Sequence, residues 1–293
     1  MQGFFGISKG KGSVTMNNRE RNQRIAQETV EILNSGSYHI GKDTVHIQPE
    51  LQQAVAGTVL YKPDGVPVEE MRKVEAPHPT VLEVTNETTL HAAQRLLQAG
   101  APKVAALNFA SARNPGGGFL KGSMAQEESL AMSSGLYACI SPLRAMYDHN
   151  TKVRTGLYSD YMSYAPDVPV FRNDTRSLLP KPHLCSFISA PAVNAKIVRE
   201  REPHNRGRID AVMKQRIEKI LTVASLHGHT HLVLGAYGCG VFENRATSVA
   251  GYFRELLLQD ERFCGRFQQV TFAILDRSPA KDMVRAFQQS LRS

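Results

Sequence analysis

The sequence contains no tryptophan, and aromatic residues make up only 7% of its 293 residues. Proteins that bind single-stranded nucleic acid without sequence preference stack bases on aromatic side chains along a basic groove. No such interleaving of aromatic and basic residues is visible, and the basic residues are scattered although the formal net charge is +8. A nucleic-acid-binding module is therefore a minor alternative, while a polyanionic partner of another kind is compatible with the charge.

Cysteine is scarce as well. The four cysteines, Cys139, Cys185, Cys239 and Cys264, stand far apart, with no CxxC pair and no ladder of histidine and cysteine. This spacing argues against a structural zinc site and against a disulfide framework. It favours reduced thiols, so we expect a cytoplasmic location, or a nuclear one if the source is eukaryotic.

Long apolar runs are also absent. No run could cross a bilayer, and the first residues lack the basic, apolar and small-residue order of a secretory signal. The hydrophobic content of 42% is enough for one large domain or two small ones. Residues 1–17 carry Gly, Ser and Lys without periodicity and are predicted to be a flexible tail. Because no repeat or interior low-complexity linker follows, we expect a single domain over residues 18–293.

Short apolar segments alternate with helical patterns from about residue 80 onwards. Strands are predicted at 80–84, 104–109, 186–190, 231–237 and 270–275, and helices at 88–98, 127–140, 209–226, 245–258 and 280–291. This rhythm is typical of a mainly parallel or mixed sheet covered by helices on both faces. An N-terminal helix precedes it, with Asn18 as the expected cap and Gly36 as the expected end. Residues 37–79 favour only short extended pieces.

The first glycine-rich loop follows the predicted strand 104–109, at the carboxyl end where open α/β sheets bind ligands. Its glycines, Gly116, Gly117 and Gly118, let the backbone press against a ligand, and exposed N–H groups suit phosphate oxygens. Asn114 can exchange hydrogen bonds with a sugar hydroxyl. An ordinary turn, with Asn114 as a turn former, is an equally open interpretation of this loop alone.

The second glycine-rich loop also lies between an apolar strand and a helix, whose N-terminus favours an anion. Its residues are Gly235, Ala236, Tyr237, Gly238, Cys239, Gly240, Val241 and Phe242. A tight turn is the alternative, but two such loops on one sheet favour a diphosphate. Cys239 has no partnering histidine at a recognisable spacing, so a packing role is favoured over a nucleophile. Phe242 is compatible with a ribose contact or with the core.

The tripeptide Gln126, Glu127 and Glu128 opens the next predicted helix. Neighbouring helical residues point about 100° apart, so only one of the two carboxylates can face a given bond. The other must have a different task. Two acidic residues that complement the helix dipole are the alternative.

Together, the triple glycine 116–118, the spacer 119–125 and the Gln-Glu-Glu at 126–128 resemble the signature of the poly(ADP-ribose) glycohydrolases in their microbial form. The segments 189–194 and 235–242 also look like this family, and the resemblance covers roughly residues 18–290. It implies a macrodomain, which is a three-layer α/β/α sandwich with a mixed sheet, here with an N-terminal helical extension.

The resemblance also implies an activity, which is hydrolysis of ribose–ribose O-glycosidic bonds in poly(ADP-ribose) with release of ADP-ribose, as in ADP-ribosylation reversal after DNA damage. It makes Glu128 the catalytic acid and base, while Glu127 holds ribose hydroxyls around the scissile bond. Asn114 and Phe242 would lie at the distal ribose. The other residues implied to bind substrate are Gly116, Gly117, Gly118, Gln126, Gly235, Ala236, Tyr237, Gly238, Cys239, Gly240 and Val241.

This chemistry requires no metal and no cofactor. The expected partner is poly(ADP-ribose), or ADP-ribose on modified proteins, with no membrane, no direct nucleic acid and a monomeric protein. The nearest alternative is a macrodomain that only binds ADP-ribose, or that removes single ADP-ribose units from proteins; the Gln-Glu-Glu signature argues against it. End-directed cleavage follows from the resemblance only, because the residues themselves leave end-directed and internal cleavage open.

Overall fold

The computed structural model describes residues 17–75 and 79–292, and its centre is a seven-stranded mixed sheet. The strand order is β3-β6-β7-β5-β8-β9-β4. These strands are β3 (Val59–Tyr61), β4 (Val81–Thr85), β5 (Val104–Phe109), β6 (Met162–Arg172), β7 (Leu178–Ala190), β8 (His231–Leu234) and β9 (Gln269–Ala273). The five strands from β7 to β4 are parallel, and β6 pairs antiparallel with both β7 and β3.

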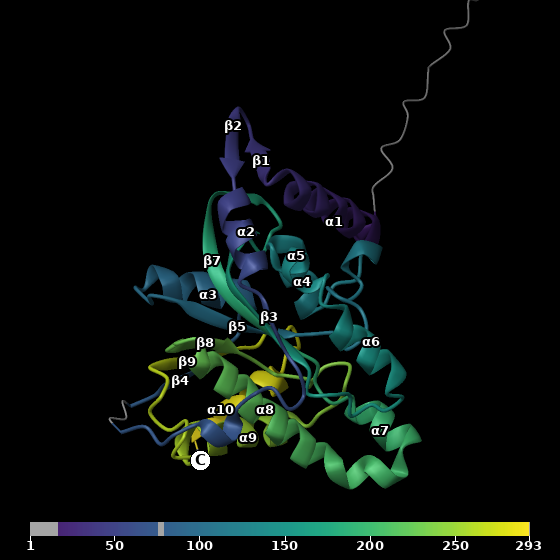
Figure 1. Cartoon of the computed structure of the whole chain (residues 1–293), viewed down its shortest axis with the longest axis vertical. Helices are drawn as coiled ribbons and strands as arrows, with labels where there is room; N and C mark the ends of the chain where they lie inside the picture. The colour runs from purple at the N-terminus through teal and green to yellow at the C-terminus, as the bar shows by residue number, and fades with distance from the viewer. Residues whose placement is uncertain (1–16, 76–78, 293) are drawn as a thin grey trace, which may run out of the picture.

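Helices cover both faces of this sheet (Figure 1). In β5, Ala105 and Leu107 join the core formed with α8 (Ile209–Leu226), α9 (Ala246–Leu258) and α10 (Asp282–Arg292). Val104 and Ala106 alternate with them and join the core formed with α3 (Thr89–Gln98), α4 (Gln126–Ser133) and α5 (Leu136–Ile140). A strand buried on both faces is mostly apolar, which is why β5 was visible in the sequence. The predicted three-layer α/β/α arrangement with a mixed sheet is confirmed.

The N-terminal helix α1 (Asn18–Ser35) begins one residue before the predicted position, because Asn17 rather than Asn18 is its cap. The Asn17 side chain accepts a hydrogen bond from the Glu20 amide, and the Glu20 carboxylate accepts one from the Asn17 amide. This reciprocal pair is a capping box. Gly36, in the left-handed region at φ +69°, ends the helix as predicted. Residues 1–16 of the predicted tail lie outside the described residues.

Residues 37–75 contain more regular structure than the sequence predicted. β1 (Ser37–Ile40) and β2 (Asp43–His46) form a separate two-stranded sheet, and a short 3-10 helix, η1 (Val68–Glu70), follows β3. The prediction of extended pieces was wrong for α2 (Gln48–Ala56), which carries Pro49 in its first turn, where the missing N–H is not needed. A helix of nine residues has too few turns for its periodicity to stand out from its neighbours.

Two further differences concern the middle of the chain. The predicted helix 127–140 is two helices, because Ser134 is fully extended and forms a bridge with Val170 of β6. The sequence also predicted only the last part of β7 and none of β6, its long antiparallel partner. The other elements that it missed are η2 (Phe119–Lys121), α6 (Arg144–Lys152), α7 (Ala195–Arg201) and η3 (Pro203–Arg208).

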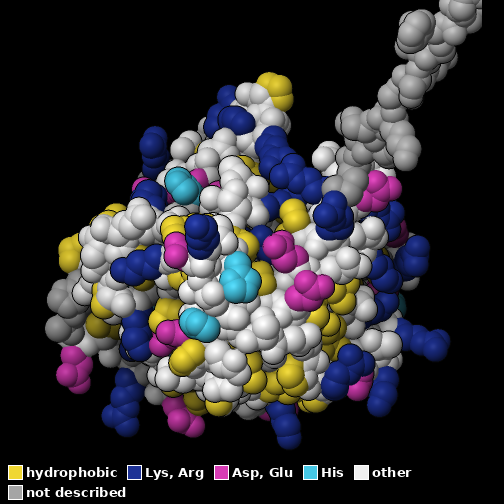
Figure 2. Space-filling model, turned by 90° about the horizontal axis from the view of Figure 1, so that it is seen from above, with side chains coloured by type: hydrophobic (Ala, Val, Ile, Leu, Met, Phe, Trp, Pro, Cys, Tyr) yellow, Lys and Arg dark blue, Asp and Glu magenta, His cyan; other side chains and the backbone are white. Residues whose placement is uncertain are grey.

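The face shown in Figure 2 carries basic side chains over its whole extent, with acidic and apolar side chains between them. They form no continuous basic stripe on this face, as the scattered arginines and lysines of the sequence suggest. Among the helices of the described residues, none combines the length and the apolar character that a membrane crossing requires.

Candidate active site

A cleft of about 1130 Å³ opens at the carboxyl ends of the parallel strands. Every parallel strand contributes lining residues that follow it closely. They are Thr88 after β4, Ser111 after β5, Ala192 after β7, Ala236 after β8 and Asp276 after β9. This edge is where open α/β sheets bind ligands, and the volume suits a nucleotide-sized molecule.

The first glycine-rich loop passes directly over the two acidic residues. Gly116 and Gly117 have φ values of +70° and +61°, a region that favours glycine. A Cβ on Gly117 would lie 2.3 Å from Glu128 Oε1 and 3.2 Å from Glu127 Oε2. The protein's own carboxylates therefore leave no room for a side chain at position 117, with or without a ligand in the cleft.

Glu127 is only 4% exposed and anchors the loop from below. Its Oε2 accepts a hydrogen bond from the Ser111 amide at 2.7 Å, and its Oε1 accepts from the Gly116 amide at 3.2 Å and from Asn108 Nδ2 at 3.4 Å. Burial raises the pKa of Glu127 to about 8, and the bonds from Ser111, Asn108 and Gly116 partly oppose that rise. Glu127 also lines the cleft, so it faces both the loop and the open cleft.

Glu128 is half-buried in the cleft wall and bridges the loop and the helix. Its Oε2 accepts from the Ala125 amide at 3.0 Å, which is the helix-capping contact that the alternative interpretation of these acids requires. Its Oε1 accepts from the Gly118 amide at 2.9 Å. The bond with the Gly118 amide ties Glu128 to the glycine-rich loop. A residue that only caps a helix does not make such a contact.

The side chain of Gln126 forms its hydrogen bonds with other parts of the protein. Its Oε1 accepts from the Phe109 amide at 2.9 Å, and its Nε2 donates to the Leu107 carbonyl at 2.7 Å and to Thr89 Oγ1 at 3.2 Å. These bonds fasten the start of α4 to the end of β5. Gln126 therefore orients the two glutamates, although it also lies in the cleft wall.

On the inner side of the second glycine-rich loop, neighbouring atoms fill the space beside the glycines. On its outer side, that space is open. A Cβ on Gly238 would lie 2.6 Å from the Ala192 Cβ, and one on Gly235 would lie 2.7 Å from the Ala273 carbonyl oxygen. At Gly240 nothing lies within 4 Å of the Cβ position. The residues of this loop that line the cleft are Ala236, Gly238, Gly240, Val241 and Phe242.

Tyr237 and Cys239 lie beneath the cleft rather than in its wall. Tyr237 is fully buried, and its hydroxyl donates to the Ala190 carbonyl at 3.1 Å. Cys239 is also buried, and burial raises the pKa of its thiol to about 12. A thiol that stays protonated at neutral pH is a poor nucleophile, so this geometry agrees with a packing role for Cys239. Gly116 and Gly235 are buried in the same way.

Asn114 and Phe242 lie on different loops, and Tyr158 connects the two. The Phe242 ring centroid is 6.1 Å from that of Tyr158, and the Arg113 guanidinium lies 5.9 Å from the Tyr158 centroid. Asn114 is exposed beside Arg113, and its carbonyl accepts from the Gly117 amide at 3.0 Å. The ends of both loops thus meet around one tyrosine.

Sequence reasoning missed part of the cleft. Thr88 and Asp276 directly follow parallel strands, so the rule that ligands bind at strand carboxyl ends could have identified them. Asp174 and Arg176 come from the turn between β6 and β7, for which the sequence held no signal. The Thr88 hydroxyl donates to Asp174 at 2.8 Å, and burial lowers the pKa of Arg176, as do the nearby charges of Arg21 and Arg277.

The described residues contain no group of three or more His, Cys, Asp or Glu side chains that could hold a metal ion. Two of the closely spaced histidines take part in a polar network with tyrosines. His227 Nε2 is 2.8 Å from the Tyr61 hydroxyl, and His229 Nε2 is 2.8 Å from the Tyr164 hydroxyl. Both histidines therefore hold tyrosine side chains in place within the fold.

Comparison with known proteins gives a consistent result. A family model described as the microbial-type PARG (poly(ADP-ribose) glycohydrolase) catalytic domain matches residues 26–173. The structure of the PARG from Thermomonospora curvata is 44% identical, with 92% of this chain and 99% of that chain covered and a TM-score of 0.88. The same protein bound to the inhibitor ADP-HPD is also 44% identical, with the same coverage and a TM-score of 0.85.

A second organism provides another similar structure. The PARG from Deinococcus radiodurans in complex with ADP-ribose is 42% identical, with 83% of this chain and 97% of that chain covered and a TM-score of 0.78. No curated protein matches the chain. The family model spans the first glycine-rich loop and both glutamates, and the structural likeness extends well beyond it. The chain belongs to the microbial-type poly(ADP-ribose) glycohydrolase family.

Proposed function

We propose that this protein hydrolyses the ribose–ribose O-glycosidic bonds of poly(ADP-ribose) and releases ADP-ribose. The observation that carries the proposal is the position of Glu128, in the cleft wall and bonded to the backbone of the triple-glycine loop. Family membership supports it, as do the ADP-ribose and ADP-HPD complexes of similar PARG structures.

The two loops hold the terminal ADP-ribose unit. The exposed side of the second loop, from Gly238 to Phe242, wraps the diphosphate with backbone N–H groups, because no side chain obstructs its approach at Gly240. Asn114 and Phe242 contact the distal ribose. Glu127 accepts hydrogen bonds from ribose hydroxyls with the lone pairs that its three loop donors leave free.

Cleavage needs a proton on the leaving oxygen and tolerance of positive charge at the anomeric carbon. Glu128 donates the proton to the oxygen of the departing ribose, and the glycosidic C–O bond breaks. The ionised Glu128 then takes a proton from water as the water oxygen bonds to the anomeric carbon. The negative diphosphate nearby stabilises the cationic centre, so a second opposed carboxylate is not required.

Glu128→Gln tests this assignment. The variant cannot donate or take the proton, so release of ADP-ribose from polymer is lost while affinity for ADP-ribose stays within about twofold. The matched control is Glu20→Gln, which removes the same charge from the same capping position of α1. Near-normal turnover by Glu128→Gln would remove Glu128 from the mechanism, and equal loss in both variants would indicate a folding effect.

Cleavage proceeds from chain ends in this proposal, on the strength of the family resemblance. Digestion of long polymer distinguishes the two modes, because end-directed cleavage yields ADP-ribose from the first time point and internal cleavage yields oligomers first. Early accumulation of oligomers would contradict the end-directed mode without affecting the role of Glu128.

The alternative is a macrodomain that only binds ADP-ribose or that removes single units from proteins. Incubation with automodified polymerase separates these activities. Free ADP-ribose with the protein-linked unit left in place supports polymer hydrolysis, and disappearance of the protein-linked unit supports the alternative. We further propose that residues 18–293 act as one domain, in a monomer, in the cytoplasm or nucleus; four free cysteines suit that reducing compartment.

A further inference from the structure

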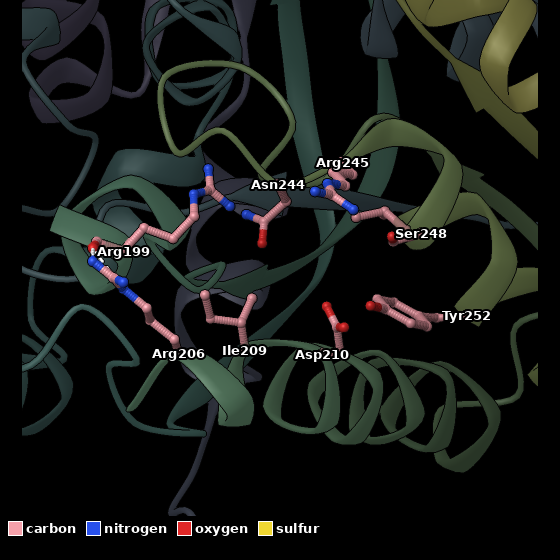
Figure 3. A pocket seen from close by; sticks show the side chains of 9 residues that line it. Arg199, Arg206, Ile209, Asp210, Asn244, Arg245, Ser248 and Tyr252 are labelled. Atoms are coloured by element: carbon pink, nitrogen blue, oxygen red, sulfur yellow. Dashed lines mark hydrogen bonds between the residues drawn. The ribbon is translucent and has the colours of Figure 1, made fainter. Parts of the chain in front are cut away.

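A second pocket, of about 270 Å³, lies close to the second glycine-rich loop (Figure 3). Three arginines from three separate segments line it. They are Arg199 of α7, Arg206 of η3 and Arg245, the residue before α9. Asp210, in the first turn of α8, is the only carboxylate among the lining residues. The pocket therefore carries an excess of positive charge, which suits an anion.

The protein leaves part of this charge without compensation. Arg199 forms an ion pair with the Glu243 carboxylate at 3.6 Å and donates to the Glu243 carbonyl at 2.7 Å. Arg206 donates to the Arg199 carbonyl at 2.8 Å. The Arg245 side chain has neither a hydrogen bond nor an ion pair within residues 17–75 and 79–292. It also stands at the N-terminus of α9, which has no side-chain cap and no acidic residue in its first turn. A cation at this end of a helix is unfavourable unless an anion joins it.

The opposite wall of the pocket offers groups that suit a sugar. Figure 3 shows the Asp210 carboxylate and the Tyr252 hydroxyl turned toward each other, with Ser248 above them. Burial raises the pKa of Tyr252, and so does the nearby Asp210 carboxylate, so the hydroxyl keeps its proton. A carboxylate accepts hydrogen bonds from sugar hydroxyls, and guanidinium groups bind phosphate oxygens in pairs.

We propose that this pocket binds a phosphate-bearing ribose segment of poly(ADP-ribose) outside the unit being cleaved. The inference rests on the proposed function, because only a polymer presents further ribose and phosphate groups while its terminal unit fills the cleft. The pocket is much smaller than the cleft, so it takes one such segment rather than a whole ADP-ribose unit.

The two sites are close along the chain. Phe242 lines the cleft and Asn244 lines the pocket, so they are joined by two peptide units that span at most about 7 Å. The Asn244 side chain fixes the position of this stretch, because its Nδ2 donates hydrogen bonds to the carbonyls of Val193 and Gly238 at 2.7 and 2.9 Å. One polymer chain can therefore contact both sides of the same loop.

Arg245→Gln tests the proposal, because this arginine has no contact to lose in the described part of the protein. The KM for long polymer should rise about tenfold at low salt, since a charge-assisted contact with phosphate is lost. The kcat, the affinity for free ADP-ribose and the melting temperature should not change. Lys42→Gln is the control, since it removes one positive charge at the β1–β2 turn, away from both sites (Figure 1). Arg206→Gln is a second variant, with the same expected direction.

Two further measurements identify the ligand. Asp210→Asn should raise the KM for polymer two- to threefold if the carboxylate holds ribose hydroxyls, whereas a lower KM would overturn the sugar contact in favour of a bare phosphate. Calorimetric titration with pyrophosphate tests a free ion as the source. Binding of pyrophosphate that Arg245→Gln abolishes, with an unchanged KM for polymer, would overturn the polymer segment as the ligand.

Equal KM values in Arg245→Gln, Arg206→Gln and Lys42→Gln would overturn the pocket's role in polymer binding. Failure of the proposed function has a different signature. In that case the unmodified protein releases no ADP-ribose from polymer, and no KM can be measured for any variant.

Discussion

The two loops of the cleft are both rich in glycine but depend on glycine for different reasons. In the first loop the protein itself requires Gly117, because the glutamates occupy the space that a side chain would need. In the second loop, Gly235 and Gly238 pack against other parts of the protein, whereas the space around Gly240 is open. The first loop is therefore shaped by the acids beneath it, and the outer half of the second loop is open toward the cleft.

This difference separates the two tasks of the site. Hydrogen bonds from the amides of Ser111, Gly116 and Gly118 hold the glutamates in position before any substrate arrives. Such preorganisation is what proton transfer requires. The residues from Gly240 to Phe242 face the cleft with few restraints from the protein, as the 82% exposure of Val241 illustrates. Substitutions at matching glycines can test whether this division is real.

Among the substitutions that compare the two loops, the largest effect is expected for Gly117→Ala. The added methyl group would overlap Glu128 Oε1 and displace the acid, and a misplacement of about 1 Å can lower kcat/KM by roughly a hundredfold. Gly41→Ala is a matched control, because Gly41 has the same φ of +61° and nothing within 4 Å of its Cβ position. The two variants should lose similar stability from backbone strain, and only Gly117→Ala should lose activity. Retained activity in Gly117→Ala would show that catalysis does not depend on the contact between this loop and Glu128.

Glu127→Gln should change how stability depends on pH. The folded-state pKa of Glu127 is raised from 4.5 to about 8. Between these two pH values the Glu127 carboxyl is therefore protonated in the folded protein and ionised in the unfolded chain. The Glu127 contribution to stability is therefore full below pH 4.5 and declines as pH rises to about 8.

The measurement is urea denaturation of both proteins across this range. The unfolding free energy of the unmodified protein should fall relative to that of Glu127→Gln, by up to about 1.4 kcal/mol per pH unit. The comparison cancels titrations that both proteins share, such as that of His229, whose pKa burial lowers to about 4. Parallel curves would mean that Glu127 is ionised in the folded protein throughout.

Gly240→Ala should weaken ligand binding while leaving the fold intact. Gly240 is not among the glycines with positive φ, and its Cβ position is empty, so the protein accommodates alanine. A bound diphosphate would meet the methyl group, and we expect affinity for ADP-ribose to fall about three- to tenfold. Calorimetry measures the affinity, and the melting temperature should stay within about 2 °C of the unmodified value. Unchanged affinity would show that the diphosphate does not touch this part of the loop.

The smallest effect is expected for Tyr237→Phe, on the inner side of the second loop. The lost hydrogen bond to the Ala190 carbonyl should lower the unfolding free energy by about 1 kcal/mol. Because Tyr237 does not line the cleft, kcat/KM should change less than twofold. A large loss of activity without a loss of stability would place the Tyr237 hydroxyl in the site after all.

The parts of the fold that the sequence predicted share one property, which is that their patterns are local. β5 begins with four consecutive apolar residues, α8 spans 209–226 as its periodicity indicates, and Gly36 ends α1. The loop signature 116–128 was legible for the same reason, since its glycines and acids lie within a short stretch. Even there, the sequence did not indicate that Gln126 bonds to β5 or that Glu127 is buried beneath Gly116.

The parts that escaped prediction depend on contacts between distant residues. β6 is recognisable only through its pairing with β7, and the turn between them brings Asp174 and Arg176 into the cleft wall. α4 and α5 are separate helices because Ser134 bridges to Val170, 36 positions further along the chain. Local propensity does not contain such pairings, because their free energy comes from partners that the chain meets only on folding.

By itself, the sequence determined the layered α/β class, the two glycine-rich loops and the order of residues that marks the family. The tertiary structure alone decided how each residue is used. It put Glu127 under the loop and Glu128 in the cleft wall, buried Tyr237 and Cys239 below a loop whose outer residues line the cleft, and gathered three arginines beside its far end. The physical reason is that exposure, hydrogen bonding and local charge depend on the neighbours of a residue in space, and those neighbours come from strands and helices far apart in the chain.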